Sequence, residues 1–249
     1  MNKIVVQKYG GTSIGDVEKL KLIAKKISDK KIEGYSPVVV VSAMGKTTDD
    51  LVKMSEEVTF NNKKPDLREK DTLLSTGELV SSTLLAISIN SLDNEVISLS
   101  GLQAGITTDN IHGSARISDI NTSRIIKEIQ QDKIIIIAGF QGVNNEGDIT
   151  TLGRGGSDTT AVAIAAALKA DLCEIYTDVE GIYTTDPRVV SKAKKLDKIN
   201  YEDMLEMAVL GAKMHPRSIE LASIYNAVSY THLRAHETLR YLVCRLLLE

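Results

Sequence analysis

The chain has 249 residues, 43% of them hydrophobic, so it is long enough to bury a large core as one big domain or two modest lobes. Its 30 basic and 33 acidic residues leave a net charge of −3, which provides no broad cationic surface for nucleic acid. With two cysteines, and no apolar run near the roughly 20 residues that span a bilayer, the sequence predicts a cytoplasmic protein without disulfide framework or membrane segment.

The first elements alternate between β-branched runs and helical patterns. Residues 3–9 predict a short buried strand, which breaks at a glycine pair before apolar residues between 17 and 27 recur at helical spacing. Residues 37–41 predict a second strand, followed by Ser42-Ala43-Met44-Gly45 and a helix start at 47–49. The unit of strand, loop and helix is therefore repeated.

The following segments continue this alternation. They are a helix over about 71–92, a strand over 95–99, a helix over 122–131, a strand over 134–138, a helix over 161–170 and a strand over 172–177. Such alternation predicts a mainly parallel sheet with helices on both faces. In sheets of this kind the ligand-binding loops lie at the carboxyl ends of the strands.

One loop stands out, the stretch Gly-Arg-Gly-Gly-Ser-Asp-Thr-Thr at 153–160. Its glycines let the backbone approach a ligand, and Ser157 or Asp158 is a good N-cap for the alanine-rich helix that follows. Free amides at that helix start, together with Arg154, favour an anion pocket. The alternative is a tight turn whose glycines serve only geometry.

A second loop predicts a phosphate site. Lys8 stands near the end of the first strand and precedes Gly10 and Gly11, whose amides no side chain covers. The loop is not a P-loop, and the Walker-like string at 45–47 lacks its upstream glycine because Val40 occupies that position. A surface lysine is the alternative, but a charge at the end of a buried strand favours a functional rim.

Other features are ambiguous by themselves. Glu78 falls among leucines in the helix 71–92, where a solvated face is the commoner fate of a carboxylate. Lys213 lies between two helical stretches and has a solvated lysine as its alternative. After the strand 172–177 comes a cluster that fits a functional site and a structural hairpin equally well. The cluster consists of Thr177, Asp178, Tyr183 and Arg188. His232 and His236 have helical spacing but no carboxylate motif, so we expect no metal site there.

Together, these strings resemble the aspartate kinase branch of the amino-acid kinase family. The matching strings lie at 8–13, 41–45, 75–78, 153–160, 176–188 and 211–216. The glycine loops alone would indicate only the wider family. The combination of Lys-Tyr-Gly-Gly-Thr-Ser, Gly-Arg-Gly-Gly-Ser-Asp and Thr-Asp-Pro-Arg points to the aspartate branch.

The resemblance implies a three-layer αβα sandwich, with L-aspartate in an N-terminal lobe and ATP with Mg²⁺ in a C-terminal lobe. It implies the product 4-phospho-L-aspartate, the first step toward lysine, threonine and methionine. The catalytic residues that it implies are Lys8, Asp158 and Lys213. The ATP-binding residues are Lys8, Tyr9, Gly10, Gly11, Thr177, Asp178, Tyr183, Arg188, Lys213 and Met214. The substrate-binding residues are Thr48, Glu78, Arg154, Gly155, Gly156 and Ser157.

The end of the chain departs from this pattern. We expect a catalytic domain over 1–226, a tail over 227–249 of foreign or frame-shifted origin, and no regulatory ACT domains. A short native helix is the competing interpretation, because leucines and a valine between 239 and 246 can form an apolar stripe. Without ACT domains, a homodimer would form through the kinase lobes.

Two other functions stay open. One is a kinase in the same fold for another amino acid or small acid, such as glutamate, acetylglutamate, carbamate or UMP. Glu78 beside Arg154 favours an amino acid that carries a free ammonium group. The other is a nucleotide-binding but inactive fragment, since loss of a regulatory half removes support for lobe closure.

Overall fold

The computed structural model describes residues 2–61, 63–176, 181–185, 189–196, 198–209, 216–224, 229–232 and 244–246. The elements are, in chain order, β1 Lys3–Tyr9, α1 Val17–Ile32, β2 Tyr35–Val41, α2 Thr47–Glu57, α3 Leu67–Asn90, β3 Val96–Leu99, β4 Ile106–Thr108, β5 Ile117–Ile120, α4 Ser123–Gln130, β6 Ile134–Ala138, β7 Gln141–Val143, β8 Ile149–Thr151, α5 Gly156–Leu168, β9 Leu172–Tyr176, β10 Lys198–Ile199, α6 Tyr201–Val209, α7 Pro216–Ile224, β11 Ser229–His232 and β12 Cys244–Leu246.

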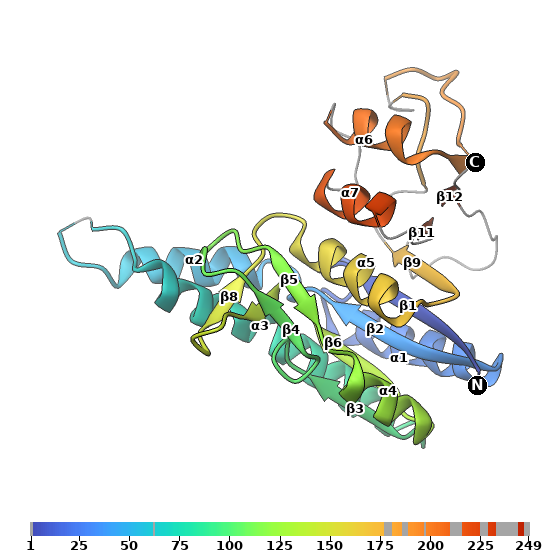
Figure 1. Cartoon of the computed structure of the whole chain (residues 1–249), viewed down its shortest axis with the longest axis horizontal. Helices are drawn as coiled ribbons and strands as arrows, with labels where there is room; N and C mark the ends of the chain where they lie inside the picture. Colours follow the sequence, from blue (N-terminus) through green and yellow to red (C-terminus); the bar gives the residue numbers. More distant parts are fainter. Residues whose placement is uncertain are drawn as a thin grey trace.

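A large sheet forms the middle layer of the molecule (Figure 1). Its strand order is β10-β12-β11-β9-β1-β2-β6-β3, and its neighbours are parallel except for β11 and β12. Helices cover both faces, so the predicted three-layer αβα fold is confirmed. β1 pairs with β2 along its whole length and with β9 on its other side, which places the loops after these strands at one edge.

The central strands are runs of valine and isoleucine because both of their faces are buried. Val38 and Val40 pack into a core that also contains apolar residues of α4, α5, α6 and α7. Val39 and Val41, which alternate with them, pack into a second core with α1 and α3. This alternation decides which helix each side chain of β1 and β2 can meet.

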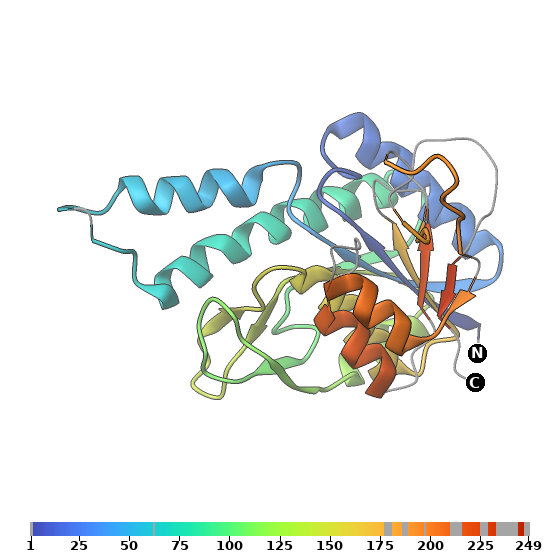
Figure 2. The same ribbon diagram turned by 90° about the horizontal axis from the view of Figure 1, so that it is seen from above.

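The helices α2 and α3 form an arm that reaches beyond the sheet (Figure 2). The side chain of Asp66 caps α3 by accepting a hydrogen bond from the Glu69 amide. By length and composition α3 could span a membrane, but half of its most apolar window is buried in the fold. It contacts α1, α2 and both sheets, as a core helix does.

A second, smaller sheet of order β5-β4-β7-β8 lies beside the main one. The alternation pattern of the sequence did not predict it, because its strands have only three or four residues and carry no long apolar run. The Gln141 side chain ties this sheet to α3 by donating to the Ser75 carbonyl at 2.8 Å. β8 then leads directly into the glycine-rich loop that precedes α5.

The start of α5 corrects one prediction. The helix begins at Gly156 with Gly155 as its N-cap, so the expectation of a cap by Ser157 or Asp158 is wrong. Gly155 has φ of 70°, a left-handed conformation that glycine adopts without strain. Because the turn closes at Gly155, Ser157 and Asp158 fall in the first helical turn, where Asp158 faces Lys8 instead of capping.

Candidate active site

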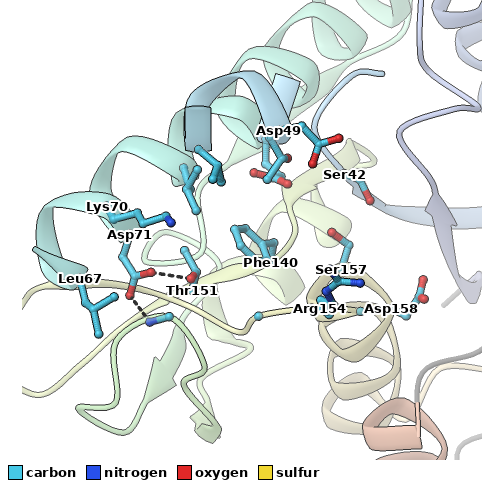
Figure 3. Close-up of a pocket in the computed structure, with 18 of the residues that line it drawn as sticks. Ser42, Asp49, Leu67, Lys70, Asp71, Phe140, Thr151, Arg154, Ser157 and Asp158 are labelled. Atoms are coloured by element: carbon cyan, nitrogen blue, oxygen red, sulfur yellow. Dashed lines mark hydrogen bonds between the residues drawn. The ribbon is translucent and has the colours of Figure 1, made fainter. Parts of the chain in front are cut away.

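A cleft of about 830 Å³ lies where β1, β2, α2, α3, β8 and the start of α5 meet (Figure 3). It brings together eight of the predicted site residues, which are Lys8, Thr48, Glu78, Arg154, Gly155, Gly156, Ser157 and Asp158. The further lining residues are Ser42, Asp49, Val52, Leu67, Lys70, Asp71, Leu74, Gly113, Phe140, Thr151 and Gly153. All six predicted substrate-binding residues therefore face one cavity.

Lys8 and Asp158 meet across 150 residues of sequence. Lys8 lies on the face of β1 that α5 covers, and its Nζ is 2.7 Å from Oδ1 of Asp158. Both side chains are largely buried, with 11% and 15% of their surface exposed. The structure thus brings together two of the residues that the resemblance implies as catalytic. The pair holds an ammonium group at the cleft, where it can reach an anion.

The N-terminus of α5 opens into the same cleft. Gly155, Gly156 and Ser157 line it; the Gly156 amide donates to the Gly153 carbonyl at 3.0 Å, while the Ser157 amide has no intrahelical acceptor and lies beside the cavity. The positive end of the helix dipole adds to this, and Arg154 precedes the turn with its side chain exposed at the cleft. The arrangement fits a ligand carboxylate or phosphate.

Glu78 is buried to 3% exposure, so the alternative of a carboxylate on a solvated face does not hold. Its position depends on the glycine at 77, because a Cβ on Gly77 would lie only 2.9 Å from the Cβ of Ala43. This close approach lets Oε1 of Glu78 accept a hydrogen bond from the Ala43 amide at 3.0 Å. Burial raises the pKa of the Glu78 carboxyl to about 7.

The second oxygen of Glu78, Oε2, is buried and has no hydrogen-bond partner among the described residues. An unpaired buried oxygen is costly, and a donor from a ligand would satisfy it. Because Glu78 lines the cleft, that donor can come from a bound molecule. A ligand ammonium group fits both the unmade hydrogen bond and the negative charge.

The predicted glycine loop lies next to Lys8. A Cβ on Gly10 would lie 3.4 Å from the Lys8 Nζ, so the bare glycine leaves room beside the ammonium group. A Cβ on Gly11 would lie 2.5 Å from the Ala43 carbonyl oxygen. This loop is thus packed closely against the segment that follows β2.

Four predicted nucleotide residues are not among the residues that line the cleft: Gly10 and Gly11, which lie beside Lys8, and Tyr9 and Tyr183. Tyr9 is completely buried, and its ring stacks on that of Tyr176 at 4.6 Å in the core with α1 and α3. Only the backbone of Tyr9 is therefore placed to meet a nucleotide. Tyr183 pairs with Lys195 in an isolated β-bridge. Thr177, Asp178, Arg188, Lys213 and Met214 lie outside the described residues.

Sequence reasoning missed several lining residues, among them Phe140, Asp71 and Thr151. Phe140 has φ of 68°, and its amide donates to the Thr160 hydroxyl at 3.1 Å. Asp71 and Thr151 belong to a hydrogen-bonded group at the far end of the cleft (Figure 3). A carboxylate in the second turn of an amphipathic helix has no local signal that distinguishes it from a solvated one.

The fold and this cleft identify the class of protein. The sequence profile of the Amino acid kinase family matches residues 3–228, and the chain belongs to that family. Its relatives within the family include aspartokinases. It is 54% identical to the aspartokinase of Geobacillus stearothermophilus over 223 residues, which are 89% of this chain and 54% of that protein.

Solved structures agree with this comparison. The aspartate kinase from Synechocystis superposes with a TM-score of 0.85 at 44% identity, covering 98% of this chain and 39% of that one. Aspartokinase III of E. coli, solved with aspartate and ADP, has a TM-score of 0.87 at 27% identity, with coverages of 99% and 65%. The chain spans about half the length of the curated relatives that it matches.

Proposed function

We propose that this chain is an aspartate kinase, which transfers the γ-phosphoryl group of ATP to the β-carboxylate of L-aspartate. The observation that carries the proposal is the cleft in which Lys8, Arg154 and the unpaired Glu78 oxygen face one another. A ligand with an ammonium group and two carboxylates fits these charges. Relatives that are about half identical to this chain are aspartokinases, and the E. coli enzyme was solved with aspartate and ADP.

The substrate roles follow from the charges. Arg154 and Ser157, with the amides at the start of α5, would hold the α-carboxylate. Glu78 would accept a hydrogen bond from the α-ammonium group at Oε2. Thr48, at the start of α2, would complete the pocket. Two fixed points on the α-carbon leave the β-carboxylate as the group free to approach the nucleotide.

The chemical step needs no general base. The β-carboxylate, with a reference pKa of about 4, is ionised at neutral pH and can act directly as the nucleophile. One of its oxygens bonds to the γ-phosphorus, while the bond from that phosphorus to the bridging oxygen breaks. The electron pair leaves with ADP, and the second product is 4-phospho-L-aspartate.

Charge repulsion is the main barrier, because an anion must approach a triphosphate. Lys8 would neutralise the oxygens of the transferring group, and Asp158 would hold its ammonium in place. The amides of Gly10 and Gly11 would support the same phosphoryl group, since the open space at Gly10 adjoins the Lys8 Nζ. Lys213 would assist from the nucleotide side.

The nucleotide would enter with Mg²⁺, which is usually held through substrate phosphates and one or two carboxylates. Bound there, the metal would offset phosphate charge. Among the described residues, no three His, Cys, Asp or Glu side chains gather as a metal cluster. Tyr9, by its backbone, and Thr177, Asp178, Tyr183, Arg188 and Met214 would surround the nucleotide.

In its cellular role, the chain would act in the cytoplasm at the first step toward lysine, threonine and methionine, with neither nucleic acid nor membrane as a partner. We also propose a homodimer. Val80, Leu84 and Ile87 are exposed on α3 at helical spacing and could form a self-association surface. Sedimentation equilibrium of wild type and Leu84→Glu would test this, because the charge should reduce self-association.

The decisive experiment measures ADP formation from ATP and Mg²⁺ with a panel of acceptors, and a hydroxamate assay identifies the acyl phosphate formed from aspartate. We expect product with L-aspartate and much less with L-glutamate, N-acetyl-L-glutamate, carbamate or UMP. A preference for another acceptor would replace the proposal. Because the chain is about half the length of its relatives, an inactive nucleotide-binding fragment is the second candidate. Calorimetric ATP binding without any phosphorylated product would select it.

A further inference from the structure

Asp71, in the second turn of α3, is a buried carboxylate that faces the cleft without being free to bind a ligand. It is 1% exposed, and it contacts two segments remote in sequence (Figure 3). Oδ1 accepts a hydrogen bond from the Thr151 hydroxyl at 2.5 Å. Oδ2 accepts one from the Gly113 amide at 2.9 Å and lies 3.0 Å from Nδ1 of His112. Both oxygens are therefore already in use.

These contacts lead directly to Arg154. Thr151 ends β8, three residues before Arg154, and its carbonyl accepts a hydrogen bond from the Ala115 amide at 2.9 Å. Gly113 supports the same loop from the other side, since a Cβ on Gly153 would lie 3.2 Å from the Gly113 oxygen. Asp71 thus anchors both segments on which the Gly153-Arg154 turn rests.

The same helix carries Glu78. Asp71 and Glu78 are seven residues apart, which is two turns and about 10 Å of α-helix, so their side chains lie on one face. Both are buried and both line the cleft. α3 therefore holds the group for the substrate ammonium at one point and anchors the loop of the carboxylate-binding arginine at another.

We propose that Asp71 is a positioning residue that sets the spacing between Glu78 and Arg154, and through it the affinity for aspartate. This inference rests on the proposed function. A carboxylate suits the task because it accepts hydrogen bonds at both oxygens. An amide is a poorer substitute, since it carries no charge and only its oxygen accepts; with that oxygen on the Gly113 amide, the charge-assisted hydrogen bond from the Thr151 hydroxyl is lost.

The test is steady-state kinetics of Asp71→Asn and Thr151→Val in the full chain. We expect the KM for aspartate to rise by about tenfold or more in each variant, because each loses the charge-assisted hydrogen bond between Asp71 and Thr151. The KM for ATP should stay within about twofold, since these contacts do not involve the Lys8 side of the cleft. Thr151→Ser, which keeps the hydroxyl, should restore most of the aspartate affinity.

A matched control separates positioning from loss of stability. Asp66→Ala removes the side-chain cap of the same helix and so lowers its stability, but leaves the contacts of Asp71 intact. This control should lower the melting temperature without raising the KM for aspartate. Combining Asp71→Asn with Arg154→Lys should raise that KM by less than the product of the single effects, because both act on one clamp.

A second readout does not depend on activity. Hydrogen exchange over residues 112–116 and 151–155 should speed up in Asp71→Asn and Thr151→Val but not in Asp66→Ala. If wild type makes no aspartyl phosphate, the proposed function fails, while unchanged exchange would overturn the positioning role by itself. An active wild type with unchanged aspartate KM in both variants would overturn the role too. Equal rises of the KM for aspartate and the KM for ATP would also overturn the positioning role.

Discussion

In the proposed reaction, Lys8 is the residue on which the chemical step would depend most. Its Nζ is held at 2.7 Å from Asp158, at the carboxyl end of β1. A fixed cation that meets developing negative charge acts mainly in the transition state, so its loss should lower turnover more than nucleotide affinity. The ion pair itself is partly a positioning device, because it restricts where the long side chain can go.

We predict that Lys8→Ala lowers kcat by about 100-fold or more while the KM for ATP changes far less. Initial rates over a range of ATP concentrations check this. Lys25→Ala, which changes an exposed lysine of α1, is the control and should behave as wild type. Wild-type kcat and KM in the Lys8 variant would show that its ammonium has no part in the reaction.

Glu78 combines its proposed role in binding the substrate ammonium group with a cost in stability. Its pKa is raised to about 7 by burial, from 4.5, so the folded protein binds the proton more tightly than the unfolded chain does. The free energy of unfolding should therefore fall as the pH rises from about 4.5 to about 7, and stay lower above it. An ionised Glu78 is what a substrate ammonium requires.

We predict that kcat/KM for aspartate rises with pH through about 7 and that Glu78→Gln abolishes this rise. At pH 8 the variant should lose on the order of 10- to 100-fold in kcat/KM, the value of a charged hydrogen bond. Melting temperatures measured between pH 5 and 8 should fall for wild type and stay flatter for the variant. If the melting temperatures of wild type and Glu78→Gln changed in parallel with pH, Glu78 would not titrate in this range.

At the scale of elements, the cleft depends on how closely the loops after β1 and β2 approach each other. The Gly45 amide donates to the Gly11 carbonyl at 3.0 Å, and the Ser42 amide donates to that of Tyr9 at 3.2 Å. The Ser81 hydroxyl of α3 donates to the Ser42 carbonyl at 2.7 Å. These hydrogen bonds fix the loops relative to the helix that carries Glu78.

We predict that Gly11→Ala lowers kcat/KM by about tenfold or more. The new Cβ would lie 2.5 Å from the Ala43 carbonyl oxygen, so the backbone at Ala43 would have to shift. Gly34→Ala is the matched control. Gly34 has φ of 89° and open space around it, so the change should cost about 1 kcal/mol of stability without affecting catalysis. Equal kinetics for both variants would show that the loops tolerate a shift.

At the scale of the whole molecule, the segment 227–249 contributes to the main sheet. β11 pairs in parallel with β9, so this part of the chain supplies main-chain hydrogen bonds at the edge of the β9 strand. Such bonds do not depend on side-chain identity. A tail of foreign or frame-shifted origin, which we still propose, can therefore occupy that edge. Sequencing the encoding DNA past codon 226 would test its origin.

We predict that a chain ending at residue 226 keeps the KM for aspartate within about twofold, because the described residues that line the cleft all fall between 8 and 158. Its melting temperature should fall by several degrees, since β9 loses a neighbouring strand. Hydroxamate kinetics and thermal unfolding of the two chains check both parts. A large rise in the KM for aspartate would mean that the tail shapes the cleft.

Sequence patterns predicted most of the main sheet and its helices. The strand at 3–9 agrees with β1, and the helix predicted over 71–92 appears as α3, Leu67–Asn90. Their apolar spacing is a local property, so it can be recognised without knowing the rest of the fold. The second sheet escaped prediction because strands of three or four residues gain their stability from partners far away in sequence.

By itself, the sequence determined the order of strands, helices and glycine loops, and the charged residues that those loops carry. Only the tertiary structure decided that Glu78 is buried, that Asp158 faces Lys8, and that Asp71 supports the loop of Arg154. The physical reason is that spacing along a chain governs which face of an element a residue occupies. Burial and charge pairing depend instead on the segments that the fold brings against that face.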